Sequence, residues 1–358
     1  MKLLLFGDLH AQKRNDEELT TINRTLLWVA DKIRKEKPDI TVFMGDLFHS
    51  PYAIESPVLN VVAKGMLRIA QQSKLLIVLM GNHDYYMQKG DEDPISNLGW
   101  LNGYPKTQLV VDEVHEMVPF VFAPYFRDAK AFIDATRQPI ENKYLFCHQD
   151  IQGLRYNKFA VDTEGINAKE DLKQYKHIFV GHYHLGQEIK TKQQTICAVG
   201  AIQHFNFATD INGEAPPCLM LVHVNKSKNG KWKVEGVTRE ANPYSFYYYT
   251  TNSINPDPSK FATGCQVEKK RTNLRLRLSP QESLQINPEE LKDWKRYEVQ
   301  LTKPKDAARS TENSIQWSDS TPDLIKKYVT LTNPDAENAD SLIALGVDIF
   351  EQGGKNGE

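Results

Sequence analysis

Short apolar runs alternate with longer amphipathic segments over the first half of the chain. Between the first three runs, apolar side chains recur with helical spacing over residues 17–36 and 57–72. Runs of this length that are bounded by polar residues are typical of buried strands. The order of strands and helices therefore predicts an α/β layered fold. The five early runs lie at residues 2–6, 40–44, 75–80, 143–147 and 177–180.

Three later segments also have the character of strands. They cover residues 195–207, 217–224 and 230–238 and are rich in β-branched and other apolar side chains. With so many strands, a mixed sheet or a pair of sheets is expected rather than one purely parallel sheet.

The composition changes near residue 243, which we take as a domain boundary. Beyond it, Leu274, Leu276 and Leu278 alternate with Arg275 and Arg277, which predicts a strand with one basic, solvated face. A polar stretch then precedes two short amphipathic segments that cannot form a core by themselves. The expected parts are a first domain at 1–243, a small domain at 244–303, a linker at 304–320 and a helical segment at 321–358.

Length and charge limit the classes of protein only loosely. A chain of 358 residues suggests two or three domains. Its net charge of −2 gives no global positive field, so composition neither requires nor excludes DNA as a partner. Four dispersed cysteines, no signal-peptide core and no membrane-length apolar run predict a soluble protein of the cytoplasm, with no membrane partner.

Every one of the five early strands is followed by side chains that can bind a metal. Ligands of open α/β sheets gather at the carboxyl ends of strands, so these groups should converge on one crevice. Any single motif is more often a turn, but five independent turns would have no reason to share so many imidazoles and carboxylates. The motifs are GDLH with Asp8 and His10, GDLFH with Asp46 and His49, GNHD with Asn82, His83 and Asp84, CHQD with His148, and GHYH with His182 and His184.

This ligand set suits the hydrolysis of phosphate esters. Two divalent cations roughly 3.5–4 Å apart can hold a phosphodiester and activate the attacking water. Mixed nitrogen and oxygen ligands favour Mn²⁺, Fe²⁺ or Zn²⁺ over Mg²⁺. The other four histidines, His115, His177, His204 and His223, are expected to be surface or packing residues.

As a set, the motifs between residues 7 and 184 resemble the calcineurin-like metallophosphoesterase superfamily. Within it, they are similar to SbcD-type DNA nuclease subunits of double-strand-break repair, which some bacteriophages also encode. The resemblance implies an α/β (α+β) fold, with a β-sandwich flanked by helices and a small α/β domain. Residues 244–303 resemble the DNA-capping domain of that family, and residues 321–358 resemble its helical segment that docks on the coiled coil of an SbcC-type ATPase.

The resemblance also implies a role for each site residue. His83 would be the acid near the leaving oxygen, Asp84 would orient it, and His49 would position the phosphodiester. Two divalent ions, most often Mn²⁺ with Mg²⁺, Fe²⁺ or Zn²⁺ as alternatives, would be bound. The first would be held by Asp8, His10, Asp46 and His184, and the second by Asp46, Asn82, His148 and His182.

The implied partners are DNA, an SbcC-type ATPase and a second copy of the chain. The family pairs through helices, and the segment 53–72 offers Val58, Val61, Val62 and Met66, although these residues could equally pack on the sheet. Arg275 and Arg277 are candidate DNA contacts. If a phage encodes the chain, the expected location is the host cytoplasm.

Two other functions fit the same core. A phosphatase or small-molecule phosphodiesterase would use the same ligands, although protein phosphatases of this superfamily usually carry GNHE where this chain has GNHD. A scaffold without catalysis would be expected to lose ligands, and none is missing here. One departure from the family is Gly200-Ala201, where relatives often carry Gly-Ser, and it affects an expected substrate contact only.

Overall fold

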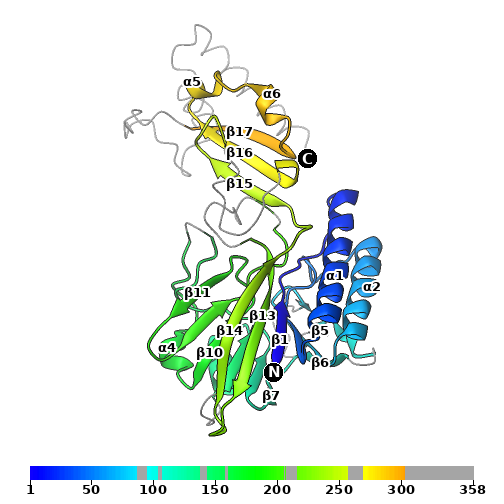
Figure 1. Ribbon diagram of the computed structural model, residues 1–358, viewed down its shortest axis with the longest axis vertical. Helices are drawn as coiled ribbons and strands as arrows, with labels where there is room; N and C mark the ends of the chain where they lie inside the picture. The colour runs from blue at the N-terminus through cyan, green and yellow to red at the C-terminus, as the bar shows by residue number, and fades with distance from the viewer. Residues whose placement is uncertain are drawn as a thin grey trace, which may run out of the picture. The chain divides into compact units, whose positions relative to one another are not determined.

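The computed structural model describes residues 1–86, 95–103, 107–137, 143–157, 160–204, 206, 216–256 and 269–302. The chain divides into two units, of residues 1–277 with 285–300 and of residues 278–284 with 301–358. Most of the described elements belong to the first unit (Figure 1). The expected linker at 304–320 and the expected helical segment at 321–358 lie outside the described residues.

The first six-stranded sheet has the order β14-β13-β1-β2-β3-β6. Its four strands β1, β2, β3 and β6 are parallel; β13 pairs antiparallel with β1, and β14 pairs antiparallel with β13. Helices α1 (Asp16–Glu36) and α2 (Ser56–Gln72) connect the first three parallel strands. The strands are β1 (Lys2–Phe6), β2 (Ile40–Phe43), β3 (Leu76–Leu79), β6 (Thr107–Val111), β13 (Cys218–Lys226) and β14 (Trp232–Ala241).

The second six-stranded sheet has the order β11-β12-β10-β9-β8-β7. Strands β8, β9, β10 and β12 are parallel, and the two outer strands are antiparallel to their neighbours. The strands are β7 (His115–Met117), β8 (Phe120–Ala123), β9 (Lys143–Cys147), β10 (Tyr175–Val180), β11 (Gln187–Lys190) and β12 (Thr195–Ala198). Short helices α3 (Ala129–Thr136) and α4 (Ala168–Asp171) accompany this sheet.

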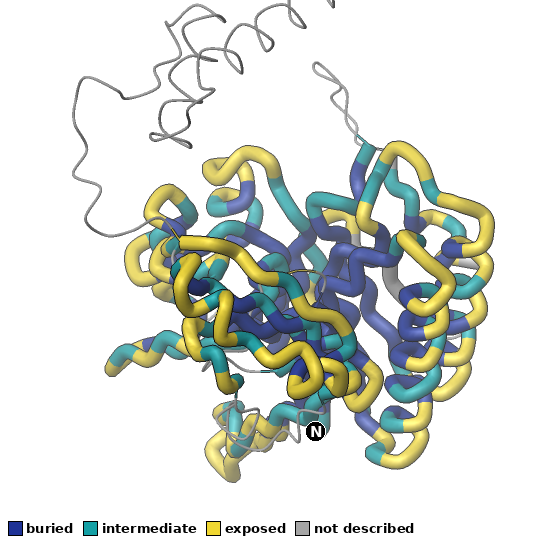
Figure 2. Tube along the Cα trace, turned by 90° about the horizontal axis from the view of Figure 1, so that it is seen from above, coloured by how far each residue is buried: buried dark blue, intermediate teal, exposed yellow. Residues whose placement is uncertain are grey.

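The two sheets pack face to face around a buried apolar core, which Figure 2 shows as the dark interior. Leu5 and Val42 of the first sheet meet Phe122 and Phe146 of the second in this core. The opposite face of the first sheet packs on α1 and α2 through residues such as Phe43. Strands covered on both faces need apolar side chains at every position, which explains the continuous apolar runs of the sequence.

Helix α2 turns most of its apolar side chains inward. Val58, Val62 and Met66 are almost completely buried in the core of their own chain, and Val61 is partly buried against it. These residues therefore serve packing on the sheet, which was the alternative to a role in dimer formation.

A third sheet of three strands has the order β15-β16-β17. On β16, the three leucines of the alternating stretch are buried, and the two arginines lie on the other face. Arg275 pairs with Glu298, and Arg277 Nε donates to Gln300 Oε1 at 3.0 Å. The elements of this region are β15 (Tyr247–Thr251), η4 (Lys269–Arg271), β16 (Thr272–Leu278), α5 (Pro280–Ser283), α6 (Pro288–Leu291) and β17 (Arg296–Leu301).

The α/β class and the pair of sheets are confirmed, and one expected strand is shorter than its apolar pattern. The strand expected at 195–207 ends at Ala198, because Gly200 adopts a φ of 88° in the left-handed region. Small elements precede the second sheet, namely β4 (Tyr85–Tyr86), β5 (Ile95–Ser96) and η1 (Gly99–Gly103). None of the described helices is long and apolar enough to span a bilayer.

Candidate metal centre

The carboxyl ends of five strands from both sheets meet at one edge of the sandwich. Asp8 and Asp46 follow β1 and β2 of the first sheet, while His148 and His182 follow β9 and β10 of the second. Three of the ten expected residues, Asp8, Asp84 and His148, are fully buried. The other seven line one cavity of about 360 Å³, and they are His10, Asp46, His49, Asn82, His83, His182 and His184.

The first expected ligand group is close-packed. The Nε2 atom of His10 lies 3.0 Å from Nε2 of His184 and 3.3 Å from Oδ2 of Asp46. Asp8, His10 and His184 offer ligand atoms that all lie within 4.8 Å of one another. The arrangement brings the side chains expected at the first ion within reach of a single cation.

The second expected group adjoins the first. Nε2 of His148 lies 3.0 Å from Oδ1 of Asn82 and 3.4 Å from Oδ2 of Asp46. Nδ1 of His182 lies 3.1 Å from the same Asn82 oxygen. Oδ2 of Asp46 is thus near His148 of this group and near His10 of the other, as expected of a carboxylate that bridges two ions.

The backbone of the candidate ligands is strained. Asp8, His10, Asp46 and His182 have φ values of 51°, 44°, 59° and 74°. Left-handed backbone at a residue other than glycine costs on the order of 1–3 kcal/mol and is concentrated at functional sites. Among the described residues other than glycine, only Lys37, which follows α1, shares this conformation without being a candidate ligand.

Glycines at the strand ends give the ligands room. Gly45 has a φ of 100°, and a Cβ atom there would collide with the imidazole of His148. A Cβ atom at Gly81 would collide with the carboxylate of Asp46. The glycines that open the GDLFH and GNHD motifs are therefore required by close approach of side chains from neighbouring loops.

The charges of His148 and Asp46 stabilise each other within the centre. Burial alone would lower the pKa of His148, but the adjacent Asp46 carboxylate raises it to about 10. Burial likewise opposes the charge on Asp46, yet its pKa lies below the ordinary value because His148 and His10 stabilise the anion. Nδ1 of His148 donates to the Met44 carbonyl oxygen at 2.7 Å, which aims Nε2 at the cavity.

Asp8 carries the observation that best fits a bound cation. Its Oδ1 accepts the amide of His182 at 2.9 Å, whereas its buried Oδ2 has no hydrogen-bond partner within the described part of the chain. Burial, reinforced by Asp46, raises the pKa of Asp8 to about 7. A buried carboxylate oxygen without a donor is costly unless a cation neutralises it. The donor set therefore fits a divalent metal.

The expected contact between Asp84 and His83 is wrong in the structure. Asp84 accepts the backbone amides of Gly81 at 2.9 Å, Asp46 at 2.7 Å and Leu47 at 3.0 Å. Its carboxylate thus braces the loops after β2 and β3, and burial together with Asp46 raises its pKa to about 7. Two of these amides, at Asp46 and Leu47, follow β2, and the third, at Gly81, follows β3.

His83 has another orienting partner. Its Nδ1 lies 2.7 Å from the carbonyl oxygen of His49, and the two imidazole rings are stacked with centroids 5.8 Å apart. A carbonyl oxygen only accepts, so Nδ1 carries the hydrogen and Nε2 is the nitrogen that exchanges a proton. His49 is exposed at the cavity, which is consistent with contact to a substrate.

The motif-based expectations missed a row of polar side chains behind His182. Oδ1 of Asp150 lies 3.0 Å from Nε2 of His182 and accepts the Tyr156 hydroxyl at 2.8 Å. The Tyr156 hydroxyl also lies 3.0 Å from Asp162, which accepts the Tyr183 hydroxyl at 2.6 Å. Asp150 is the last residue of CHQD, so the motif itself contained the signal. Its hydrogen bond from His182 is the main reason that the pKa of Asp150 is lowered.

Four residues outside the motifs also line the cavity. They are Arg14, just before α1, with Tyr156, Asn157 and Asn206. Arg275 and Arg277 are not among the residues that line it. The one expected packing histidine that proves unusual is His204, which is 2 % exposed.

Residues 1–200 match the family of calcineurin-like phosphoesterases, and this match covers more than half of the chain. The chain belongs to this family. Its members hydrolyse phosphoesters with bound divalent metals, so the chain is a metal-dependent phosphoester hydrolase. No curated protein matches the sequence.

Several solved structures are distantly similar in fold. GAP50, the anchor in the inner membrane complex of Plasmodium, is 11 % identical with a TM-score of 0.40, over 68 % of this chain and 90 % of that one. A single mutant of Vps29 from Entamoeba histolytica is 12 % identical with a TM-score of 0.33, over 67 % and 99 %. A putative 5′-nucleotidase from Staphylococcus aureus is 9 % identical with a TM-score of 0.40, over 67 % and 54 %. Similarities this distant do not identify the substrate of this chain.

Replacing Asp150 by Asn should weaken metal binding without unfolding the protein. The amide cannot hold the proton of His182 Nε2 as a carboxylate does, and loss of such a partner typically costs about 10–100-fold in affinity. Calorimetric titration of Mn²⁺ into chelator-stripped protein measures the change. Asp31→Asn, at an exposed surface pair with Arg34, is the matched control. Equal affinities for the two variants would contradict the role of Asp150.

The metal-free protein should lose stability as the pH rises from about 6.5 to 10. His148 has a folded pKa of about 10. Its stabilisation is complete below its unfolded pKa of roughly 6.5 and is lost as the pH rises through the folded value. The raised pKa values of Asp8 and Asp84 act in the same direction up to about pH 7.

The free energy of unfolding, measured by denaturant titration in the presence of chelator, should fall by up to ~1 kcal/mol for each pH unit. The lowered pKa values of His10 and His184 alter stability only below about pH 6.5, so they do not mask it. His148→Gln removes the titrating group and should flatten the curve. An equally steep decline in that variant would rule out His148 as its source.

Proposed function

We propose that the chain is a DNA nuclease of the SbcD type, with exonuclease and endonuclease activity at DNA ends. The observation that carries the proposal is a complete two-ion ligand set in a chain that also has a basic third sheet. Residues 269–302 contain eight Lys or Arg and five Asp or Glu, which gives this region a positive excess suited to a phosphate backbone. The motif resemblance to SbcD-type subunits supports the same conclusion.

The ions that the two groups would hold supply Lewis acidity and an activated water when bound. The chain's own side chains do the rest. His83 turns Nε2 to exchange a proton with the leaving oxygen, and the His49 carbonyl holds its ring in position. The His49 ring stacks on His83 and would contact the scissile phosphodiester. Asp84 keeps the loops after β2 and β3 together.

The metal most suited to the site is Mn²⁺. Imidazole nitrogens and carboxylate or amide oxygens are mixed in both groups, whereas Mg²⁺ prefers oxygen ligands and retained waters. Fe²⁺ and Zn²⁺ share the preference for mixed ligands and are the alternatives.

The second candidate function is that of a phosphatase or small-molecule phosphodiesterase on the same core. The family match favours both functions equally. The basic third sheet favours the nuclease, because a small substrate would not require it.

The purified chain should degrade linear DNA in Mn²⁺ and lose this activity in chelator. Asp46→Ala should abolish activity because both ligand groups share this carboxylate. His83→Ala should retain both ions while turnover falls by roughly 10²–10⁴, as expected for a lost general acid. Gel assays on labelled DNA and metal analysis measure the two effects. Hydrolysis of p-nitrophenyl phosphate without cleavage of any DNA would instead support the second candidate function.

We also propose that the chain acts with an SbcC-type ATPase and as a homodimer. The support for both is the resemblance, in which residues 321–358 correspond to the docking segment. With Val58, Val62 and Met66 buried in the chain's own core, a dimer would use other surfaces.

Light scattering of the chain alone and mixed with the ATPase checks both assemblies. The expected results are a dimer alone, a larger complex in the mixture, and no complex after removal of residues 305–358. The truncated chain should keep its Mn²⁺-dependent nuclease activity. A monomer at all concentrations would exclude the dimer, and ATPase binding by the truncated chain would exclude the docking role of the tail.

A further inference from the structure

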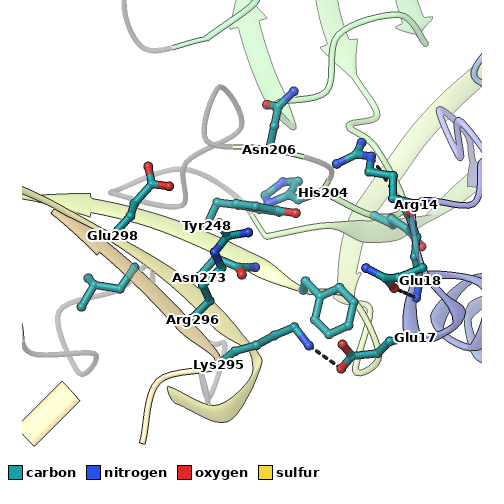
Figure 3. A pocket seen from close by; sticks show the side chains of 14 residues that line it. Arg14, Glu17, Glu18, His204, Asn206, Tyr248, Asn273, Lys295, Arg296 and Glu298 are labelled. Carbon is teal, nitrogen blue, oxygen red and sulfur yellow. Dashed lines mark hydrogen bonds and ion pairs between the residues drawn. The ribbon is translucent and has the colours of Figure 1, made fainter. Parts of the chain in front are cut away.

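A second cavity of about 370 Å³ adjoins the candidate metal centre (Figure 3). Two residues, Arg14 and Asn206, line both this cavity and the one that contains the candidate ligands. All residues on its walls belong to the first unit of the chain. The volume lies within the roughly 300–1,000 Å³ typical of small-molecule sites. A substrate bound at the metal centre can therefore extend into this cavity.

The walls come from several segments that are far apart in the chain. The start of α1 with Glu17 faces the start of β17, and Lys295 forms an ion pair with Glu17 across the gap (Figure 3). Phe246 and Tyr248, at and beside the start of β15, supply aromatic surface, and both are partly buried. Lys295 Nζ lies 4.1 Å from the centroid of the Phe246 ring. The aromatic surface is thus held in place by the surrounding charges.

Two buried side chains on the wall have polar atoms without a hydrogen-bond partner among the described residues. His204 is 2 % exposed, and neither of its ring nitrogens is hydrogen-bonded within the described residues. Gln203 is 3 % exposed, and its Oε1 is likewise unsatisfied there. In Figure 3, His204 and Tyr248 point into the space between the start of α1 and β17. Buried polar atoms of this kind are expected to meet a ligand or an ordered water.

The charge of the cavity excludes a second phosphate as its main occupant. Its lining has equal numbers of cationic and anionic side chains, so it offers no excess of positive charge. A planar, uncharged group with several donors and acceptors fits this environment better. Burial lowers the pKa of His204 to about 3, so the imidazole is neutral and presents one donor and one acceptor. The charged residues are Arg14, Lys295 and Arg296 with Glu17, Glu18 and Glu298.

We propose that this cavity binds the nucleobase next to the scissile phosphodiester. Tyr248 stacks on the base, while His204, Gln203 and Asn273 offer hydrogen bonds to its edge. Arg14, on the wall of both cavities, is positioned between base and phosphate. The inference rests on the proposed nuclease function and adds a base-binding subsite to it.

The test compares two chromogenic diesters in Mn²⁺. Bis(p-nitrophenyl) phosphate has no base, whereas the p-nitrophenyl ester of thymidine 5′-monophosphate carries one, and the 3′ isomer is tested beside it. Loss of one stacking side chain costs on the order of 10-fold in binding of a base. Tyr248→Leu should therefore lower kcat/KM for a thymidine ester about 10-fold more than for the diester without a base. The readout is kcat/KM for the thymidine ester divided by kcat/KM for bis(p-nitrophenyl) phosphate.

Tyr297→Leu is the matched control, because Tyr297 lies on β17, is 40 % exposed and is not part of the cavity lining. It should leave the ratio unchanged. If Tyr248→Leu fails the thermal-melting check for folding, Asn273→Ala on the same wall is measured in its place. A fall in the ratio with either thymidine isomer supports the base subsite.

Two failures are distinguishable. If the wild-type chain cleaves DNA and the esters but Tyr248→Leu and Asn273→Ala change kcat/KM for all of the esters in proportion, the base subsite is wrong and the nuclease function stands. If the wild-type chain cleaves neither these diesters nor DNA, the phosphodiesterase function itself fails, and the subsite fails with it.

Discussion

Three carboxylates are buried together where the two sheets of the sandwich meet. Asp8, Asp46 and Asp84 are each at most 1 % exposed. Burying like charges is costly unless protons, donors or cations compensate them. Much of the local structure supplies that compensation. Asp84 accepts hydrogen bonds from three backbone amides, and Asp46 lies beside the imidazole of His148. One oxygen of Asp8 has no hydrogen-bond partner among the described residues and can bind a metal.

The strained backbone and the glycines follow from the same constraint. Left-handed φ values at Asp8 and Asp46 turn these side chains back toward the strand ends. Gly45 and Gly81 leave the space that the imidazole of His148 and the carboxylate of Asp46 occupy. The strained backbone thus occurs at the residues whose charged side chains form the centre, which is common in catalytic sites.

The sequence predicted the strands and the convergence of the site residues well, because both depend on local patterns. Each of the five apolar runs that precede a metal-binding motif is a strand, and the side chains that follow these strands come together at one centre. It predicted side-chain partners less well, as Asp84 and His83 show. Which carboxylate faces which imidazole depends on how loops from different strands fold over one another. His204 was overlooked for a similar reason, since its environment includes a sheet that lies far along the chain.

Both ligand groups draw on both sheets, and this has a consequence for when the chain can become active. The group of Asp8 and His10 needs His184 from the second sheet, and the group of Asn82 needs His148 and His182. Neither half of the sandwich holds a full set. A fragment that lacks residues 143–184 therefore lacks ligands of both groups. Hydrolytic activity therefore requires both sheets in the same folded chain, because each ion would depend on side chains from both of them.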